Sequence, residues 1–328
     1  MLVGLCVSQY SEVRTTVQPI VFDLAKKYRN FGDELILKLI PHLHKKEQHE
    51  GRDEDVIELL TVHLKDHLGK VGLPETLNLL YANRKAAHVV GNYLLQNHVD
   101  QKDLTMRQIV RLGSNEMIAV RNWVKQMYNE KPDRIQYELS EAVRVLDSKW
   151  EDMRVFAEDF FRHKINEKKW TPEILVSICD SVNPLVQQFG KEMIAKHFKE
   201  ENGEQYLLQL SQHPTAELQQ FATNYLERFA KDNPENIEKL KHYFITVLSG
   251  VNKSRVAKKR IFSFLKKEAL KDKFTAEVVA EVLARQSATM AIGDKARCID
   301  IMSVLQEHFS DLELPLEKEE FEDYPIAI

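Results

Sequence analysis

A run of basic side chains between positions 253 and 273 is the feature of the sequence best suited to binding a ligand. Lysine and arginine bind phosphate and carboxylate groups, and an affinity for nucleic acid that depends on them falls steeply with salt. The run therefore predicts either a surface for an anion or a protein partner, or a solvated helix face that binds nothing. The candidate residues are Lys253, Arg255, Lys258, Lys259, Arg260, Lys266 and Lys267, with Lys271 and Lys273 continuing the run.

A helix over this run would separate a charged side from a buried one. Arg255, Lys259 and Lys266 lie roughly on one side of such a helix. We expect these side chains to form a basic ridge along the surface. The predicted buried stripe consists of Val256, Ile261, Phe264 and Leu265.

An acidic segment further along the chain could cover this ridge. Residues 311–323, DLELPLEKEEFED, contain seven carboxylates and one lysine. Pro315 and Pro325 disfavour a helix, so residues 311–328 are predicted to leave the fold as an extended acidic tail. Two interpretations stay open, a solubilising tail and a segment that folds back to mask the ridge.

Two histidines have a spacing that could serve a metal ion. His63 and His67 are four residues apart on a predicted helix, so both imidazoles could face one ion. No cysteine or third ligand stands at a set spacing from them. We therefore predict surface histidines and no metal site.

Signatures of common enzyme and cofactor sites are absent from the sequence. There is no GxxxxGK[ST], GxGxxG, GxSxG or HExxH, so we predict no catalytic and no cofactor-binding residue. A site assembled from distant segments stays open, as in helical-repeat DNA glycosylases, where tryptophans can stack on bases. Trp123 is predicted to lie in the core, whereas Trp150 and Trp170 stand near turns and are predicted to be exposed.

The sequence contains a repeat of about 33 residues, and the helices of this repeat are expected to position the candidate side chains. Amphipathic stretches begin at Val120, Met153, Val186 and Leu218, at steps of 33, 33 and 32 residues. Within each stretch apolar residues recur at the spacing of a helix with one buried face. Four residues after each start the side chain is short, which predicts a close approach by a neighbouring helix. These positions are Val124, Ala157, Gly190 and Ala222.

A shorter apolar stretch precedes each amphipathic one, and proline or glycine turns separate the pairs. The shorter stretches are Ile109–Leu112, Ala142–Leu146, Ile174–Ile178 and Tyr206–Leu210. Looser copies of the second helix are expected to start near Val13, Ala87, Val256 and Ala296. One helix pair cannot bury its apolar face alone, so the pairs are expected to stack.

The predicted fold is an all-α, right-handed solenoid of about eight or nine HEAT-like helix pairs, forming a single domain over residues 1–310. The charged residues 45–55 are predicted to be a polar insertion. Only residues 2–7 precede the helix at Val13, so the first pair is expected to be truncated. We expect the chain to be part of a longer solenoid.

The openings Glu12-Val13-Arg14 and Ala119-Val120-Arg121 resemble the HEAT-repeat consensus, in which a valine–arginine pair begins the second helix. Other copies depart from it, with Gln187, Gln219 and Ala257 in place of the arginine. Residues 251–270 and 285–302 resemble large bacterial HEAT-repeat proteins. Some of those carry WGR or molybdate-regulator-like regions, and others accompany MoxR-type ATPases. The resemblance implies an armadillo-like scaffold or regulator, an ATPase-associated partner and no catalytic residue.

Composition and charge further restrict the class of protein and the compartment in which it is expected. With 43% hydrophobic and 29% charged residues the chain is typical of globular proteins, and a net charge of −4 is too small to imply a polyanionic partner for the whole molecule. Cys6, Cys179 and Cys298 form no CxxC pair, which favours a reducing compartment. No apolar run approaches the roughly 18 residues of a membrane span. We predict a cytoplasmic protein without a membrane partner.

The leading hypothesis is a non-catalytic interaction scaffold that binds a protein partner on the solenoid surface. The second is a nucleic-acid-binding helical-repeat module that uses the basic ridge at 253–273. The third is a helical-repeat enzyme similar to a DNA glycosylase. None of the three requires a cofactor.

Overall fold

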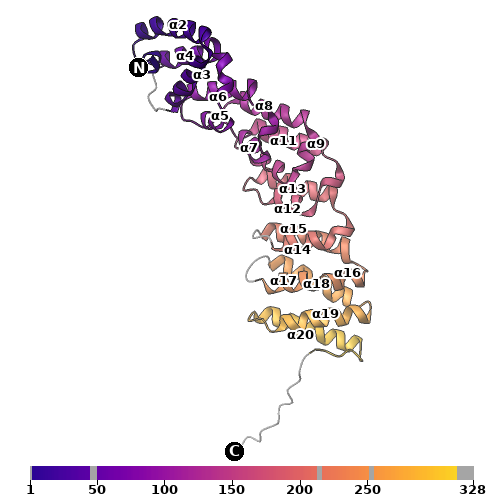
Figure 1. Ribbon diagram of the computed structural model, residues 1–328. Coiled ribbons are helices and arrows are strands. Elements are labelled where there is room, and N and C mark those ends of the chain that lie inside the picture. The colour runs from indigo at the N-terminus through magenta and orange to yellow at the C-terminus, as the bar shows by residue number, and fades with distance from the viewer. Residues whose placement is uncertain (1, 45–49, 213–215, 251–254, 316–328) are drawn as a thin grey trace, which may run out of the picture. The chain divides into compact units, whose positions relative to one another are not determined.

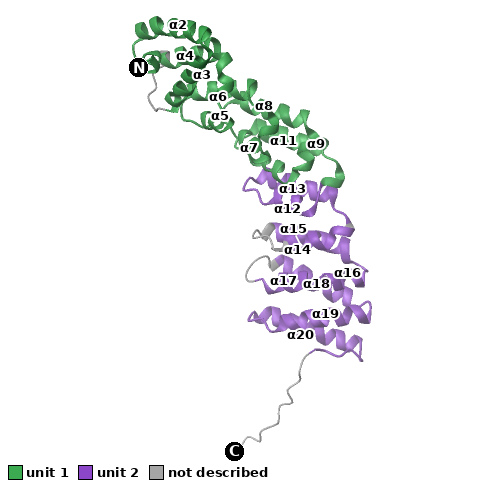
Figure 2. Cartoon of the chain, in the orientation of Figure 1, with its two compact units in different colours: residues 1–169 green, residues 170–328 purple. Residues whose placement is uncertain are grey.

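The computed structural model describes residues 2–44, 50–212, 216–250 and 255–315 (Figure 1). Every regular element over these residues is a helix, which confirms the predicted all-α class. The chain divides into two compact units, residues 1–169 and 170–328 (Figure 2), and each is described by itself. None of the described helices combines the length and the apolar character that a membrane crossing requires.

Unit 1 is built from eleven α-helices over its described residues, joined by short 3₁₀ turns and one π-helical turn. Neighbours in sequence pack against each other, as α5 does with α6 and α7 with α8. The helices are α1 (Leu2–Cys6), α2 (Ser11–Lys27), α3 (Arg29–Leu39), α4 (Glu50–Glu58), α5 (Leu73–Leu80), α6 (Lys85–Asn97), α7 (Met106–Leu112), α8 (Ile118–Glu130), α9 (Pro132–Tyr137), α10 (Leu139–Ala142) and α11 (Glu151–His163).

Unit 2 is more regular. Helices α12 and α13, α14 and α15, and α19 and α20 form packed pairs, and α14 contacts both α12 and α17. Contacts of α15 with α18 and of α17 with α19 continue the arrangement along the unit. The helices are α12 (Pro172–Cys179), α13 (Pro184–His197), α14 (Gly203–Gln212), α15 (Ala216–Ala230), α16 (Pro234–Lys239), α17 (Lys241–Ser249), α18 (Arg255–Ala269), α19 (Lys273–Ser287) and α20 (Ile292–His308).

Local sequence signals fix where several helices begin. The hydroxyl of Thr105 accepts a hydrogen bond from the backbone N–H of Gln108, whose side chain accepts one from the Thr105 N–H in return, and this capping box starts α7. Thr171 caps α12 in front of Pro172, and Asn183 caps α13 in front of Pro184. Proline suits the first helical turn because its missing N–H would be unpaired there in any case.

The arginines of the repeat close the turn within their own helix pair. The Nη1 atom of Arg121 donates to the carbonyl of Asn115 at 2.9 Å, and that of Arg154 donates to the carbonyl of Ser148 at 2.8 Å. At the next copy Gln187 makes the equivalent bond to Ser181 at 2.6 Å. The departure from arginine at Gln187 therefore preserves the contact.

Short side chains lie where two helices approach closely, as predicted. A Cβ atom added to Gly190 would lie 2.7 Å from the Sγ atom of Cys179 and 3.0 Å from its backbone nitrogen. One repeat step before Val124, a Cβ on Gly91 would lie 3.0 Å from the backbone nitrogen of Leu80. The second helix of each of these pairs thus rests directly on the backbone of the first.

Two predicted boundaries are wrong in detail. Residues Ala142–Leu146 are not one helix, because α10 ends at Ala142 and a 3₁₀ turn follows over Val143–Asp147. Ala296 lies inside α20, which begins at Ile292. The predicted insertion at 45–55 lies outside the described residues at 45–49, and its remainder belongs to α4, where Asp53 and Asp55 pair with Arg84 and Arg14. Asp53 and Asp55 thus hold α4 against the fold.

Candidate functional site

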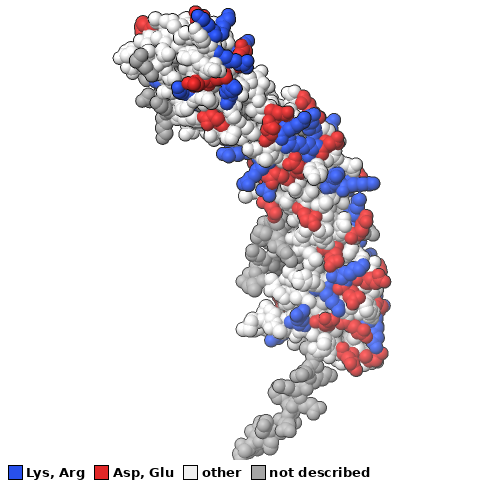
Figure 3. Space-filling view, viewed as in Figure 1, with Lys and Arg blue, Asp and Glu red and all other residues white. Residues whose placement is uncertain are grey.

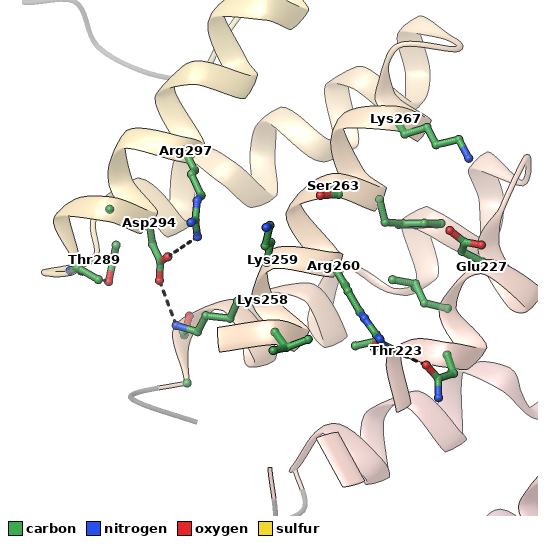
Figure 4. A pocket seen from close by; sticks show the side chains of 18 of the residues that line it. Thr223, Glu227, Lys258, Lys259, Arg260, Ser263, Lys267, Thr289, Asp294 and Arg297 are labelled. Carbon is green, nitrogen blue, oxygen red and sulfur yellow. Dashed lines mark hydrogen bonds and ion pairs between the residues drawn. The ribbon is translucent and has the colours of Figure 1, made fainter. Parts of the chain in front are cut away.

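A groove with a cavity volume of about 1230 Å³ lies in unit 2, among α15, α18, the start of α20 and the turns at 249–250 and 289–291 (Figure 4). Four of the seven candidate residues line it, namely Lys258, Lys259, Arg260 and Lys267. Arg297 from α20 adds a fifth cation, against the two carboxylates Glu227 and Asp294. We call this feature the basic groove.

Burial of the opposite side of α18 turns its basic side toward the groove. Ile261 and Leu265 are fully buried and Phe264 nearly so, as predicted. Val256 is half-exposed, and Ala257 takes the predicted place of Val256 in the buried stripe. The stripe therefore leaves positions 258 to 260, 263 and 267 free to line the groove.

Three of the groove cations have partners in its walls. The Nζ atom of Lys258 lies 3.3 Å from Asp294, and Arg297 lies 3.6 Å from the same carboxylate (Figure 4). The Nη1 atom of Arg260 donates to the Thr223 hydroxyl at 3.1 Å and to the Asn224 side-chain oxygen at 2.9 Å. These contacts join α18 to α20 on one side and to α15 on the other.

Lys259 and Lys267 differ from those cations. Both side chains are exposed and line the groove, and neither forms an ion pair with a residue that the structure describes. They are eight positions apart on α18, which corresponds to about 12 Å along the helix axis. The groove thus presents two ammonium groups that no described carboxylate contacts directly, although Lys267, after Lys271, contributes to lowering the pKa of Asp232.

The rim of the groove also offers apolar surface. Met290, in the turn before α20, is 96% exposed, and Val256 at the start of α18 is 49% exposed. Leu226 and Phe264 line the wall between them. A groove that combines ammonium groups with exposed apolar side chains matches a ligand that carries both carboxylates and apolar groups.

The remaining predicted ridge residues do not join the groove. Lys266 pairs with Asp300 at 3.2 Å, and Lys273 begins α19 and pairs with Asp311 at 2.8 Å. Lys271 lies in the turn after α18 and contacts Glu268 at 2.6 Å. Lys253 and the side chain of Arg255 lie outside the described residues. Since α18 ends at Ala269, Lys271 and Lys273 lie beyond this helix, and the basic ridge as a binding surface stays a prediction.

Sequence reasoning missed the groove residues that come from other helices. Thr223 on α15, Arg260 on α18 and Arg297 on α20 follow one another at steps of 37 residues and meet at one site. The longer step of the last repeats could have placed them side by side. The turn residue Met290 carries no such signal.

His63 and His67, predicted to lie on one helix at the surface, stand in different turns, and His67 is buried. His63 ends the π-helical turn, with its ring centroid 5.0 Å from that of Phe22. His67 lies in the following 3₁₀ turn, where its Nδ1 atom lies 2.8 Å from Asp33 and this hydrogen bond lowers the pKa of the Asp33 carboxyl. Across the described residues no group of three histidine, cysteine or acidic side chains is arranged to hold a metal ion.

The tryptophans are placed differently from the prediction. Trp170 is buried, with its ring 5.8 Å from that of His197, so its predicted exposure is wrong. Trp123 is half-buried, not a core residue. Trp150 is also half-buried, and the guanidinium of Arg121 lies 4.3 Å from the centre of its ring. Arg121 therefore covers part of the Trp150 ring, the group proposed for stacking on bases.

The cysteines are buried and unsuited to nucleophilic chemistry in this conformation. Burial raises the pKa of Cys179 to about 12 and that of Cys298 to about 11. A thiol with such a pKa stays protonated near neutral pH, and the thiolate is the reactive form. Cys6 is buried as well, and burial also raises its pKa.

Charges of both signs are interspersed on the face of unit 2 that is turned to the viewer in Figure 3. Lysine and arginine side chains alternate there with aspartate and glutamate, and no broad patch of one sign forms on that face. On that face, positive potential able to bind an anion is therefore local and not spread over the unit.

Comparison with protein-family models and with curated proteins finds no match to this chain.

Proposed function

We propose that this chain is a non-catalytic interaction scaffold, a solenoid of HEAT-like helix pairs that binds an acidic segment of a protein partner in the basic groove. The recurrent turn contacts of Arg121, Arg154 and Gln187 support the repeat architecture. In such a fold each pair contacts mainly its neighbours, which leaves extended surfaces available for partners.

The proposal depends on which cations of the groove have a partner in its walls and which have none. Lys259 and Lys267 lack close carboxylate partners among the described residues, while the cations beside them are engaged by Asp294 and by Thr223. Two exposed ammonium groups next to apolar side chains suit a peptide that alternates acidic and apolar residues.

A protein partner fits the groove better than a nucleic acid does. The groove contains Asp294 and Glu227, and a continuous phosphate backbone would pass close to both carboxylates. Like charges at short range oppose binding. A peptide can place its carboxylates only at Lys259 and Lys267 and its apolar groups at Met290. The ridge as a nucleic-acid surface is thus the weaker proposal.

Affinity capture with the full chain tests the proposal. The double variant K259Q/K267Q removes both charges that lack a direct partner. As a control, K266Q/K295Q removes two charges of α18 and α20, Lys266 and Lys295, which do not line the groove. We expect a partner that survives nuclease treatment, persists with the control and is lost at least several-fold with the groove variant.

Three results would overturn this function. Capture that disappears with nuclease would favour the nucleic-acid module instead. Equal capture by the groove variant and the control would exclude the groove as the binding surface. No specific capture in any arm would remove the support for a scaffold.

A further inference from the structure

The residues directly after α20, the last helix that the structure describes, are held in place by contacts. After α20 ends at His308, Leu312 is buried and Asp311 lies 2.8 Å from Lys273. The hydrogen bond from Lys273 also lowers the pKa of Asp311, so this ion pair is formed at neutral pH. Residues from 313 onward therefore start from a fixed point at the C-terminal end of α20.

The basic groove is within reach of the acidic segment that follows. Helices α18 and α20 run in the same direction, because Lys258 pairs with Asp294 and Lys266 with Asp300. The end of α20 is therefore nearer to Lys267 than to Lys259. The 17 residues of α20 span about 25 Å, and the eleven residue steps from Leu312 to Asp323 span up to about 36 Å when extended.

The composition of the segment complements the groove. Residues 316–323, LEKEEFED, contain five carboxylates and one lysine, with Phe321 among them and Tyr324 directly after. The groove offers Lys259 and Lys267 for carboxylates, and Val256 and Met290 for an aromatic ring.

The spacing of two carboxylates in the segment also matches the spacing of the two groove lysines. Lys259 and Lys267 are about 12 Å apart along α18. Glu319 and Asp323 are four residues apart, about 13 Å in an extended chain. Since the segment enters from the end nearer to Lys267, Glu319 would meet Lys267 and Asp323 would meet Lys259.

We propose that residues 316–323 occupy the basic groove of their own chain and mask Lys259 and Lys267 until an acidic partner segment displaces them. This inference rests on the proposed function, since it assigns a competing occupant to the same groove. A tethered segment acts at an effective concentration in the millimolar range, so even a weak contact would regulate access.

A labelled peptide of residues 313–328 tests the contact by fluorescence anisotropy. Its binding is measured to the full chain and to a full-length variant with a neutral segment, E317Q/E319Q/E320Q/E322Q/D323N. We expect the neutral-segment variant to bind the peptide about tenfold or more tightly than the unchanged chain, because it lacks the competitor. The affinity should fall as salt rises.

Variants of the groove lysines test whether the peptide binds in the basic groove. Adding K259Q/K267Q to the neutral-segment variant should weaken peptide binding about tenfold, whereas adding K266Q/K295Q should leave it within about twofold. Zero-length carbodiimide cross-linking of the unchanged monomer should join Lys259 or Lys267 to a carboxylate between 317 and 323.

Distinct results overturn the two proposals separately. Equal peptide binding by the unchanged and neutral-segment chains, or binding insensitive to K259Q/K267Q, would overturn the masking proposal. Failure of the peptide to bind either chain, with partner capture still dependent on Lys259 and Lys267, would overturn it while the proposed function stands. Loss of groove-dependent partner capture would remove the proposed function itself.

Discussion

Buried arginines serve structure in this chain and are not available for ligands. Arg14 and Arg121 are nearly buried, and each pairs with an aspartate of a later segment, Asp55 at 2.6 Å and Asp152 at 3.0 Å. The same side chains donate to backbone carbonyls of the preceding turn. The valine–arginine openings that resemble HEAT repeats are therefore explained by turn closure and by contact between pairs.

Replacing Asp152 with asparagine should destabilise the fold in a pH-dependent manner. Burial alone would raise the pKa of Asp152, but hydrogen bonds from Lys125 and Arg121 outweigh it and lower the pKa. A lowered pKa in the folded state contributes stability above the ordinary carboxyl pKa, and this contribution is lost as pH falls through the lowered value. We expect Asp152→Asn to reduce the free energy of unfolding at pH 7 by about 1–2 kcal/mol.

Urea denaturation at pH 7 and pH 3 measures this effect. The difference between variant and parent should shrink at the lower pH. Asp159→Asn serves as a control, because Asp159 is exposed and pairs with His163 one helical turn away. An Asp152 effect that is equal at both pH values would contradict the explanation.

At the scale of helices, short side chains set the distance within a pair. Gly190 lets α13 rest on Cys179 of α12, and the fully buried Ala157 and Ala222 occupy the equivalent repeat position. The sequence repeat predicted these contacts because a large side chain at this position would disturb the partner backbone.

Gly190→Ala should therefore destabilise the protein although alanine favours helices. The added methyl would lie 2.7 Å from a sulfur and 3.0 Å from a backbone nitrogen, and overpacking of this kind costs about 1–3 kcal/mol. Gly293→Ala in α20 meets no atom within 4 Å and should be neutral or stabilising, by up to about 1 kcal/mol. Thermal unfolding of the two variants compares them, and a stabilising Gly190→Ala would contradict the close approach.

Much of the helical pattern could be predicted from the sequence. Val120, Met153, Val186 and Leu218 are each the third residue of the second helix in its pair, in α8, α11, α13 and α15. The repeat was informative because the buried face of each second helix is continuous. First helices were harder to predict, since the breaks at Glu138 and Leu240 fall where the sequence contains no proline or glycine.

The groove could be predicted only in part. Its four cations on α18 belong to one continuous run that is visible in the sequence. Arg297 and Thr223 come from neighbouring helices, and which lysines are neutralised depends on partners such as Asp294 and Asp300. Pairing across helices is decided by packing and leaves no local pattern.

At the scale of the molecule, the interactions that join helix pairs are local in sequence. Asn115 donates to the carbonyl of Leu80 and Ser148 to that of Gly113, both across 35 residues, and Gln286 donates to Leu248 across 38. In the proposed solenoid, stability would be approximately a sum of contributions from each pair and its neighbours. Disturbance of one pair should therefore remain confined.

Hydrogen exchange of the Gly190→Ala variant tests whether a disturbance of one helix pair remains confined to its neighbours. We expect faster exchange in α12 to α15, with the amides of α5 and α6 in unit 1 unchanged. Exchange read by mass spectrometry at the peptide level resolves the two regions. Uniform acceleration along the whole chain would show that the units unfold as one cooperative structure.

The exposed thioether of Met290 at the rim makes the groove sensitive to oxidation. Peroxide converts methionine to a polar sulfoxide, and Met290, at 96% exposure, is open to that reaction. Oxidation would remove apolar surface from the groove while leaving every charge in place. A ligand would then lose one of its apolar contacts but keep Lys259 and Lys267, so oxidative stress would shift a mixed contact toward an electrostatic one that is weakened by salt.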